Sequence, residues 1–194
     1  MRLKNTVQKT VAIVVIVLLA VLFGYLYQII GHSSDLKKHP REYTEYVERF
    51  AAEYGVPEQV IYASVLNMSG FQSNLVSNDG RIGLMQMTPE TLRSLTVMTK
   101  ETQESGILYD PETNIRYGTY MMSYLFTKYN RWKTVVAIML TDEKTVTEWM
   151  KDSANTDEQG NLTSIPDKSV AARVQAIEED IEMYSKLYYS SNER

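Results

Sequence analysis

Residues 60–91 read VIYASVLNMSGFQSNLVSNDGRIGLMQMTPET, and three local structures follow from them. The apolar side chains of residues 60–68 recur at helical spacing, and Gly70 is a residue type that ends helices. Residues 71–87 are rich in turn formers, which predicts a loop. Thr88-Pro89-Glu90 combines a capping hydroxyl, a first-position proline and a first-turn acid, so a new helix is predicted there. The stretch is therefore helix, loop and helix.

The flanking sequence extends this helical pattern in both directions. A helix is predicted from Pro40 to Gly55, and the next one begins at Pro57. Asp110-Pro111-Glu112 repeats the start signal seen at Thr88. Further helices are predicted over residues 111–129, 132–140, 145–151 and 166–189. Sustained alternation of apolar and polar residues is missing from the sequence, so the fold class is all-α, with a small irregular β element within residues 72–86.

Residue usage excludes several kinds of chemistry. The chain of 194 residues has no cysteine, so disulfides, thiol nucleophiles and cysteine-based zinc sites are excluded. The only histidines, His32 and His39, precede the predicted domain. A Ser-His-Asp triad or a histidine-rich metal site inside that domain is thus excluded as well. We expect no cofactor and no metal, and any proton transfer would need carboxylates.

Charge is unevenly distributed along the chain. Residues 1–30 carry Arg2, Lys4 and Lys9 and no acid, which leaves 17 basic and 24 acidic side chains, or about −7, for the remainder. Nucleic-acid binding needs a basic surface to meet the phosphates. We therefore expect no nucleic-acid partner.

Residues 11–30, VAIVVIVLLAVLFGYLYQII, carry no charge. About twenty such residues cross roughly 30 Å of hydrocarbon as a helix. The basic residues lie on the N-terminal side, so residues 1–10 are predicted to be a cytoplasmic tail and residues 31–194 extracytoplasmic. We expect a single-pass anchor in the cell membrane, followed by a polar tether over residues 31–39.

Two other interpretations of this apolar segment remain open. A cleaved signal peptide would have a shorter apolar run and a small-residue cleavage site, and residues 28–32 offer none that is convincing. A buried core helix would normally keep a polar face for water, which this segment lacks. The sequence favours the uncleaved anchor.

Two motifs resemble those of the SLT-type lytic transglycosylases. Gly83-Leu84-Met85-Gln86, followed by Thr88-Pro89-Glu90-Thr91, is similar to the Gly-Leu-Met-Gln turn of that family and the helix after it. Residues 109–119, YDPETNIRYGT, are similar to its Asp-Pro-x-x-Asn-Ile-x-x-Gly segment. The similarity extends from about Tyr43 to Tyr188. It implies a lysozyme-like domain over residues 40–190 that acts on the glycan strands of peptidoglycan.

The same resemblance shows where this chain departs from its family. The family has its catalytic Glu before the serine of Ser-x-Phe, and Met68 stands there. Residues 139–142, MLTD, replace Tyr-Asn-Ala-Gly, and residues 169–174, SVAARV, replace Glu-Thr-x-x-Tyr-Val. No catalytic residue is therefore assigned. Ser69, Met85 and Gln86 still match cleft positions, and the resemblance makes them the expected substrate-binding residues.

The loss at position 68 removes a proton carrier. Glycosidic cleavage requires protonation of the leaving oxygen and stabilisation of a sugar cation. The resemblance implies that one Glu with a raised pKa serves first as acid and then as base. A thioether can do neither, and Met68 is favoured as a core side chain. Asp79 and Asp142, near the expected cleft, are the candidates for a substitute carboxylate.

We therefore predict a membrane-anchored, extracytoplasmic transglycosylase-like domain that binds peptidoglycan and has lost lytic activity. Two alternatives remain: an active enzyme that uses another carboxylate, and a scaffold that recruits an unknown protein partner. Ser69 and Gln86 also have a structural interpretation beside the binding one. Ser69 would cap a helix end, and the Gln86 amide would hold its turn.

Overall fold

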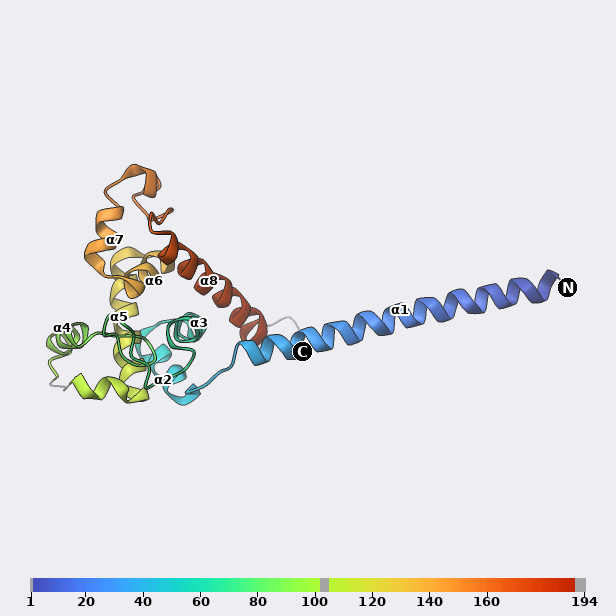
Figure 1. The fold of residues 1–194 in the computed structure, drawn as a ribbon, viewed down its shortest axis with the longest axis horizontal. Helices are drawn as coiled ribbons and strands as arrows, with labels where there is room; N and C mark the ends of the chain where they lie inside the picture. Colours follow the sequence, from blue (N-terminus) through green and yellow to red (C-terminus); the bar gives the residue numbers. More distant parts are fainter. Residues whose placement is uncertain (1, 102–104, 191–194) are drawn as a thin grey trace. The chain divides into compact units, whose positions relative to one another are not determined.

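The computed structural model describes residues 2–101 and 105–190, and the side chains of residues 15–25, 31–101 and 106–190. The chain divides into two units, Met1–Pro40 and Arg41–Arg194. Each is considered by itself. The first unit is essentially one helix, and the second contains the remaining elements (Figure 1).

Helix α1 runs from Arg2 to Lys38. It includes all of the apolar segment 11–30, and it continues through residues 31–38, so most of the predicted tether is helical. Among the residues that the structure describes, no helix has the length and apolar character needed to cross a membrane. The side chains of residues 11–14 and 26–30, which belong to the predicted anchor, lie outside the described set. The side chains of residues 15–25 are exposed.

The second unit is helical throughout its regular structure. Its elements are α2 (Thr44–Tyr54), α3 (Glu58–Ser69), α4 (Pro89–Thr99), η1 (Ser105–Tyr109), α5 (Pro111–Tyr129), α6 (Trp132–Leu140), α7 (Glu143–Trp149), η2 (Ser153–Asn155), α8 (Lys168–Tyr184) and η3 (Ser185–Tyr189). The described residues contain isolated bridges but no strand; two of these bridges, Val76–Ile82 and Ile82–Met87, lie in the loop between α3 and α4. The predicted all-α class is confirmed.

Local sequence signals account for most helix ends. The Thr88 hydroxyl accepts a hydrogen bond from the Thr91 amide at 3.0 Å at the start of α4. At the start of α5, the Asp110 carboxylate accepts a hydrogen bond from the Thr113 amide at 2.8 Å. Such caps satisfy amides that have no partner within the helix. Helices α2, α3 and α5 end at left-handed Gly55, Gly70 and Asn130, as the sequence predicts.

Three of the predicted helices have wrong boundaries. Helix α2 begins at Thr44 rather than Pro40, because Tyr43 adopts a left-handed conformation with φ of 55°. Helix α7 spans residues 143–149 rather than 145–151, because the Asp142 carboxylate caps it by accepting from the Thr145 amide at 2.8 Å. The last helix begins at Lys168, where Asp167 is the cap, and residues 185–189 form a π-helical turn instead of continuing α8.

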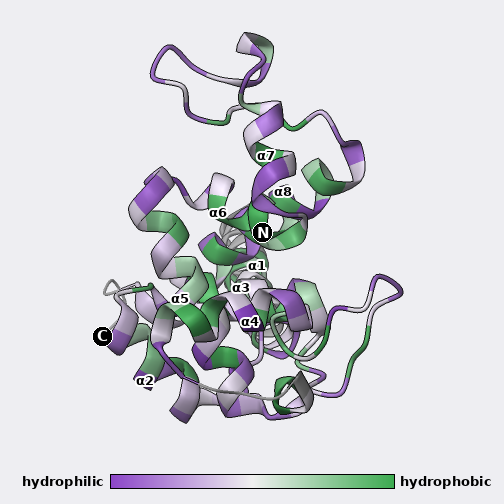
Figure 2. Ribbon diagram, turned by 90° about the vertical axis from the view of Figure 1, so that its left-hand side faces the viewer, coloured by the Kyte–Doolittle hydropathy of each residue, from purple (hydrophilic) through white to green (hydrophobic). Residues whose placement is uncertain are grey.

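The core of the second unit lies between α3, α5, α6 and α8. Tyr62 of α3 is fully buried and stacks on Tyr184 of α8 at 5.5 Å between ring centroids. Asn67, further along α3, donates to Asp180 at 2.6 Å, so the two helices run antiparallel. Figure 2 shows that hydrophobic and hydrophilic residues share each helix of this unit, as expected for helices with one buried face.

Asn114 of α5 fixes the loop that precedes α4. Its side chain is fully buried. Its Nδ2 donates to the carbonyls of Leu108 at 2.8 Å and Ile82 at 3.0 Å, and its Oδ1 accepts from the Met85 amide at 2.7 Å. One side-chain amide thereby satisfies three backbone groups, and its bonds to the Met85 amide and the Leu108 carbonyl are buried. The close approach requires glycine at position 83, where a Cβ would lie 2.1 Å from Asn114 Nδ2.

Replacing Asn114 with alanine should lower the free energy of unfolding by about 3 kcal/mol, because the Met85 amide and the Leu108 carbonyl each lose a buried hydrogen bond, and the Ile82 carbonyl keeps only its bond from the Met87 amide. The measurement is urea unfolding of the full-length protein followed by tryptophan fluorescence. Asn78→Ala, at an exposed position, is the matched control and should change stability by less than about 0.5 kcal/mol. Equal stabilities of the two variants would contradict the assigned role of Asn114.

Candidate functional site

A cavity of about 620 Å³ opens beside the loop that Asn114 holds. Its wall comes from residues 79–88 of that loop, from α4, from α5, and from the segment where α6 ends and α7 begins. The apolar part of the wall contains five methionines, which are Met85, Met87, Met98, Met121 and Met139. The charged part contains Asp79, Arg81, Glu90, Asp142 and Glu143. The cavity thus has an apolar wall and a charged rim.

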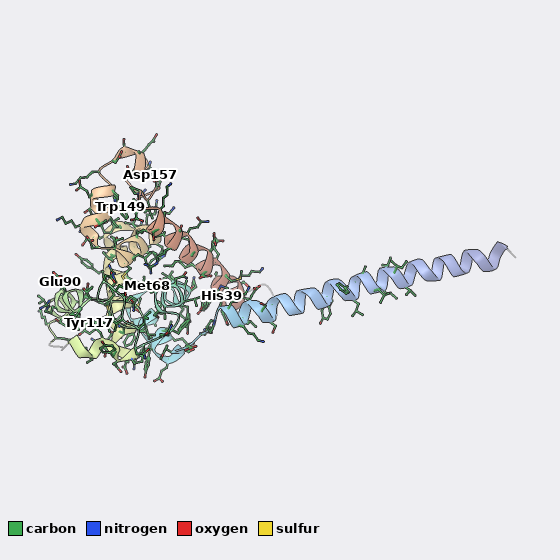
Figure 3. The ribbon with its side chains drawn as sticks, in the orientation of Figure 1. His39, Met68, Glu90, Tyr117, Trp149 and Asp157 are labelled. Carbon is green, nitrogen blue, oxygen red and sulfur yellow. The ribbon has the colours of Figure 1, made fainter. Side chains whose placement is uncertain are left out.

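Met68, at the position where the family resemblance expects the acid, does not line this cavity. Its side chain is 6% exposed and belongs to the main hydrophobic core. Figure 3 marks it within the helical part of the domain. Packing therefore gives Met68 the structural role that was predicted for it, as an apolar core side chain.

The three residues expected to bind substrate are placed differently from one another. Ser69 is 4% exposed and donates to the Val65 carbonyl at 3.1 Å, and it does not line the cavity. Met85 and Gln86 do line it. Met85 is fully buried and packs close to Gly118, where a Cβ would lie 2.2 Å from its sulfur. The structure therefore brings two of the three residues to the cavity.

The side-chain amide of Gln86 is hydrogen-bonded to the backbone of its own loop. Its backbone is left-handed with φ of 49°. Its Nε2 donates to the carbonyl of Gly83 at 2.8 Å and to that of Leu75 at 3.3 Å. These bonds stabilise a backbone conformation that is costly for a residue with a side chain. This geometry favours the structural interpretation of the amide over a free ligand-binding role.

Arg81 joins the loop to the end of α6, a role that the sequence analysis missed. Its Nε donates to Asp79 at 2.9 Å, one terminal nitrogen donates to the Met139 carbonyl at 2.8 Å, and the other donates to the Thr141 carbonyl. A cation stabilises the carbonyls at a helix C-terminus, which have no partner within the helix. The two carbonyls lie 58 and 60 residues further along the chain, so no local pattern could reveal the contact.

A second arginine lies near Arg81. Desolvation and the charge of Arg81 lower the pKa of Arg173, and the Asp79 carboxylate partly opposes them. Helices α3 and α8 are antiparallel, so Arg173, near the start of α8, lies toward the C-terminal end of α3. Residue 173 replaces the tyrosine expected from the family. An exposed cation on α8 therefore stands where the resemblance expects a neutral phenol.

Three of the cavity carboxylates, those of Asp79, Asp142 and Glu143, have lowered pKa values and are poor proton donors. Hydrogen bonds from Ser77 and Arg81 lower the pKa of Asp79, and those from the Thr145 hydroxyl and amide lower that of Asp142. Hydrogen bonds from Lys128 and Tyr129 lower the pKa of Glu143, and burial partly opposes them. A general acid for glycosidic cleavage needs a raised pKa instead. Neither Asp79 nor Asp142 therefore meets the requirement for a substitute acid.

The described residues also contain no group of three or more acidic or histidine side chains placed to hold a metal ion. This finding covers only that part of the chain. The cavity chemistry is thus set by methionines, carboxylates and one guanidinium.

The all-helical arrangement with this loop defines a lysozyme-like transglycosylase fold. Its solved neighbours include the 70 kDa soluble lytic transglycosylase Slt70 from Escherichia coli, with a TM-score of 0.72, 23% identity, and coverage of 80% of this chain and 26% of that one. An inactive mutant of lytic transglycosylase Slt from Pseudomonas aeruginosa has a TM-score of 0.69 and 23% identity over 76% of this chain and 24% of that chain.

Residues 45–162 match the transglycosylase SLT domain, and the chain belongs to that family. A membrane-bound lytic murein transglycosylase C from Edwardsiella ictaluri is 31% identical over 57% of this chain and 31% of its own length. The protein of the same name from Yersinia pestis is 35% identical over 50% of this chain and 28% of its own length. This chain thus spans less than a third of these relatives.

Replacing Asp142 with asparagine should keep the α7 cap, since both residue types cap helices, while replacement with alanine should cost about 1 kcal/mol. The folded-state pKa of Asp142 is lowered, so its ionised form stabilises the fold above the unfolded pKa of about 3.9. That contribution is lost as pH falls through the folded pKa. The difference between wild type and Asp142→Asn should therefore shrink on acidification, as measured by urea unfolding at neutral and acidic pH. A stability difference that grows on acidification would contradict the assigned role of the Asp142 charge.

Proposed function

We propose that this chain is a membrane-anchored, extracytoplasmic transglycosylase-like domain that binds peptidoglycan and does not cleave it. The observation that carries the proposal is Met68 at the position of the family's catalytic Glu. The lowered pKa values of Asp79, Asp142 and Glu143 support it, because these acids stay ionised near neutral pH. Membership of the transglycosylase SLT domain family supports peptidoglycan as the ligand.

The proposed division of the chain is a cytoplasmic tail over residues 1–10, a transmembrane anchor over 11–30, a tether over 31–39 and the folded domain over 40–190. The continuous helix α1 and the uncharged residues 11–30 support the anchor. The positive charges within residues 1–10 support a cytoplasmic N-terminus. Relatives that are named membrane-bound agree with this location.

The anchor makes a direct prediction about extraction. The full-length protein should stay in the membrane pellet after washing with alkaline carbonate and should be released by detergent, because about twenty apolar residues are held in hydrocarbon. A variant without residues 1–30 is the control and should appear in the soluble fraction. Release of the full-length protein by carbonate would contradict a spanning segment.

Binding without cleavage needs a shaped site but no acid. We place the glycan strand against the loop that contains Met85 and Gln86. Ser69 would contribute indirectly, by holding the end of α3. The test incubates the purified full-length protein with sacculi. The protein should sediment with the sacculi and release no 1,6-anhydro-muropeptides. Sustained release would restore the interpretation as an active enzyme, and failure to sediment would favour the scaffold.

The variant Met68→Glu should not restore cleavage. The new carboxyl would lie in the apolar core, at a position that does not line the cavity. The tyrosine and asparagine of the family are also missing from residues 139–142. We expect a rate below about a hundredth of that of an active family member, measured as anhydro-muropeptide release. Met68→Gln, which has similar size and no charge, controls for disturbance of the core.

A further inference from the structure

The methionine wall of the cavity continues onto the protein surface. Met85, Met87 and Met139 are buried at its base. Met98 of α4 and Tyr124 of α5, which line the mouth, are each 42% exposed. Methionine is flexible and polarisable, so such a wall adapts to apolar groups of different shapes. The accessible part of the cavity therefore suits an apolar side chain.

The rim of the cavity is negative after its ion pairs are taken into account. Four carboxylates and one guanidinium line it. Arg81 pairs with Asp79, and Lys128 pairs with Glu143. Glu90 of α4 has no ion pair among the described residues. The Asp142 carboxylate accepts hydrogen bonds from the amide and hydroxyl of Thr145, which are neutral groups. Two negative charges thus remain at the rim, and Figure 3 shows Glu90 on α4.

An apolar wall beside carboxylates that form no ion pair favours a particular ligand chemistry. Lysine and arginine lay apolar stems along apolar surface and keep their charged ends in water or near an acid. A negatively charged ligand would be repelled. A peptide that alternates apolar and basic side chains matches both parts of the cavity.

We propose that the cavity between the 79–88 loop, α4, α5 and the α6–α7 junction binds a basic, apolar peptide segment of a partner protein. Apolar side chains of the segment contact Met98, Met121 and Tyr124. Its lysine or arginine side chains lie near Glu90 and Asp142. Peptide binding at this cavity does not depend on any lytic activity.

The test uses the full-length protein in uncharged detergent and a fluorescent peptide of alternating leucine and lysine, with empty micelles measured in parallel. Fluorescence anisotropy should show saturable binding that weakens as ionic strength rises. The double variant Glu90→Gln/Asp142→Asn should weaken binding about five- to thirty-fold. Met98→Ser should weaken it about three- to tenfold.

Matched controls separate the cavity from the rest of the surface. Glu158→Gln removes one exposed acid outside the cavity, and Val97→Ser removes an apolar side chain that neighbours Met98 but does not line the wall. Both should bind the peptide like the wild type. A peptide of alternating leucine and glutamate should not bind.

Three results would overturn the proposal. The first is equal affinity of the wild type and the Glu90/Asp142 double variant for the lysine peptide. The second is equal binding of the lysine and glutamate peptides, which would show unselective apolar contact. The third is concentration-dependent dimerisation that removes peptide binding, since the cavity would then be covered by a second copy. None of these results bears on whether sacculi are bound or cleaved.

Discussion

The buried Asn114 amide is the contact on which the functional region depends. It holds the carbonyls of Ile82 and Leu108 and the amide of Met85, so one side chain of α5 fixes both the loop before α4 and the η1 segment. The same loop provides Met85, Gln86 and Arg81 to the cavity. Because buried polar groups are costly without partners, the loop has little freedom to adopt another conformation.

Charge underlies our proposal that this domain does not cleave glycan strands. The family scaffold survives in the helices, in the Gly83–Gln86 turn and in the Asn114 contacts. At the position where the resemblance expects a buried carboxyl, the chain has Met68 in the core. Hydrogen bonds and cations lower the pKa values of Asp79, Asp142 and Glu143. Under the proposal, the site keeps its shape and lacks a proton source.

The Arg81 contact joins the two sides of the cavity. It connects the loop to the carbonyls of Met139 and Thr141, within residues 139–142, which are one of the segments in which this chain departs from its family. The methionine wall and the rim acids line the same cavity. The proposed peptide binding depends on this surface, and the proposed glycan contact depends on the turn around Gln86.

The sequence alone determined the all-α class, the family and the ends of α2, α3 and α5, because helix periodicity, caps and short motifs are local properties. Starts of α2 and α7 were misplaced by a few residues, since left-handed Tyr43 and the Asp142 cap compete with propensity. Only the tertiary structure decided that Ser69 does not line the cavity, that Arg81 joins the loop to the end of α6, and that Lys128 pairs with Glu143. The last two features depend on partners far apart in the chain, and folding alone brings them within hydrogen-bonding distance.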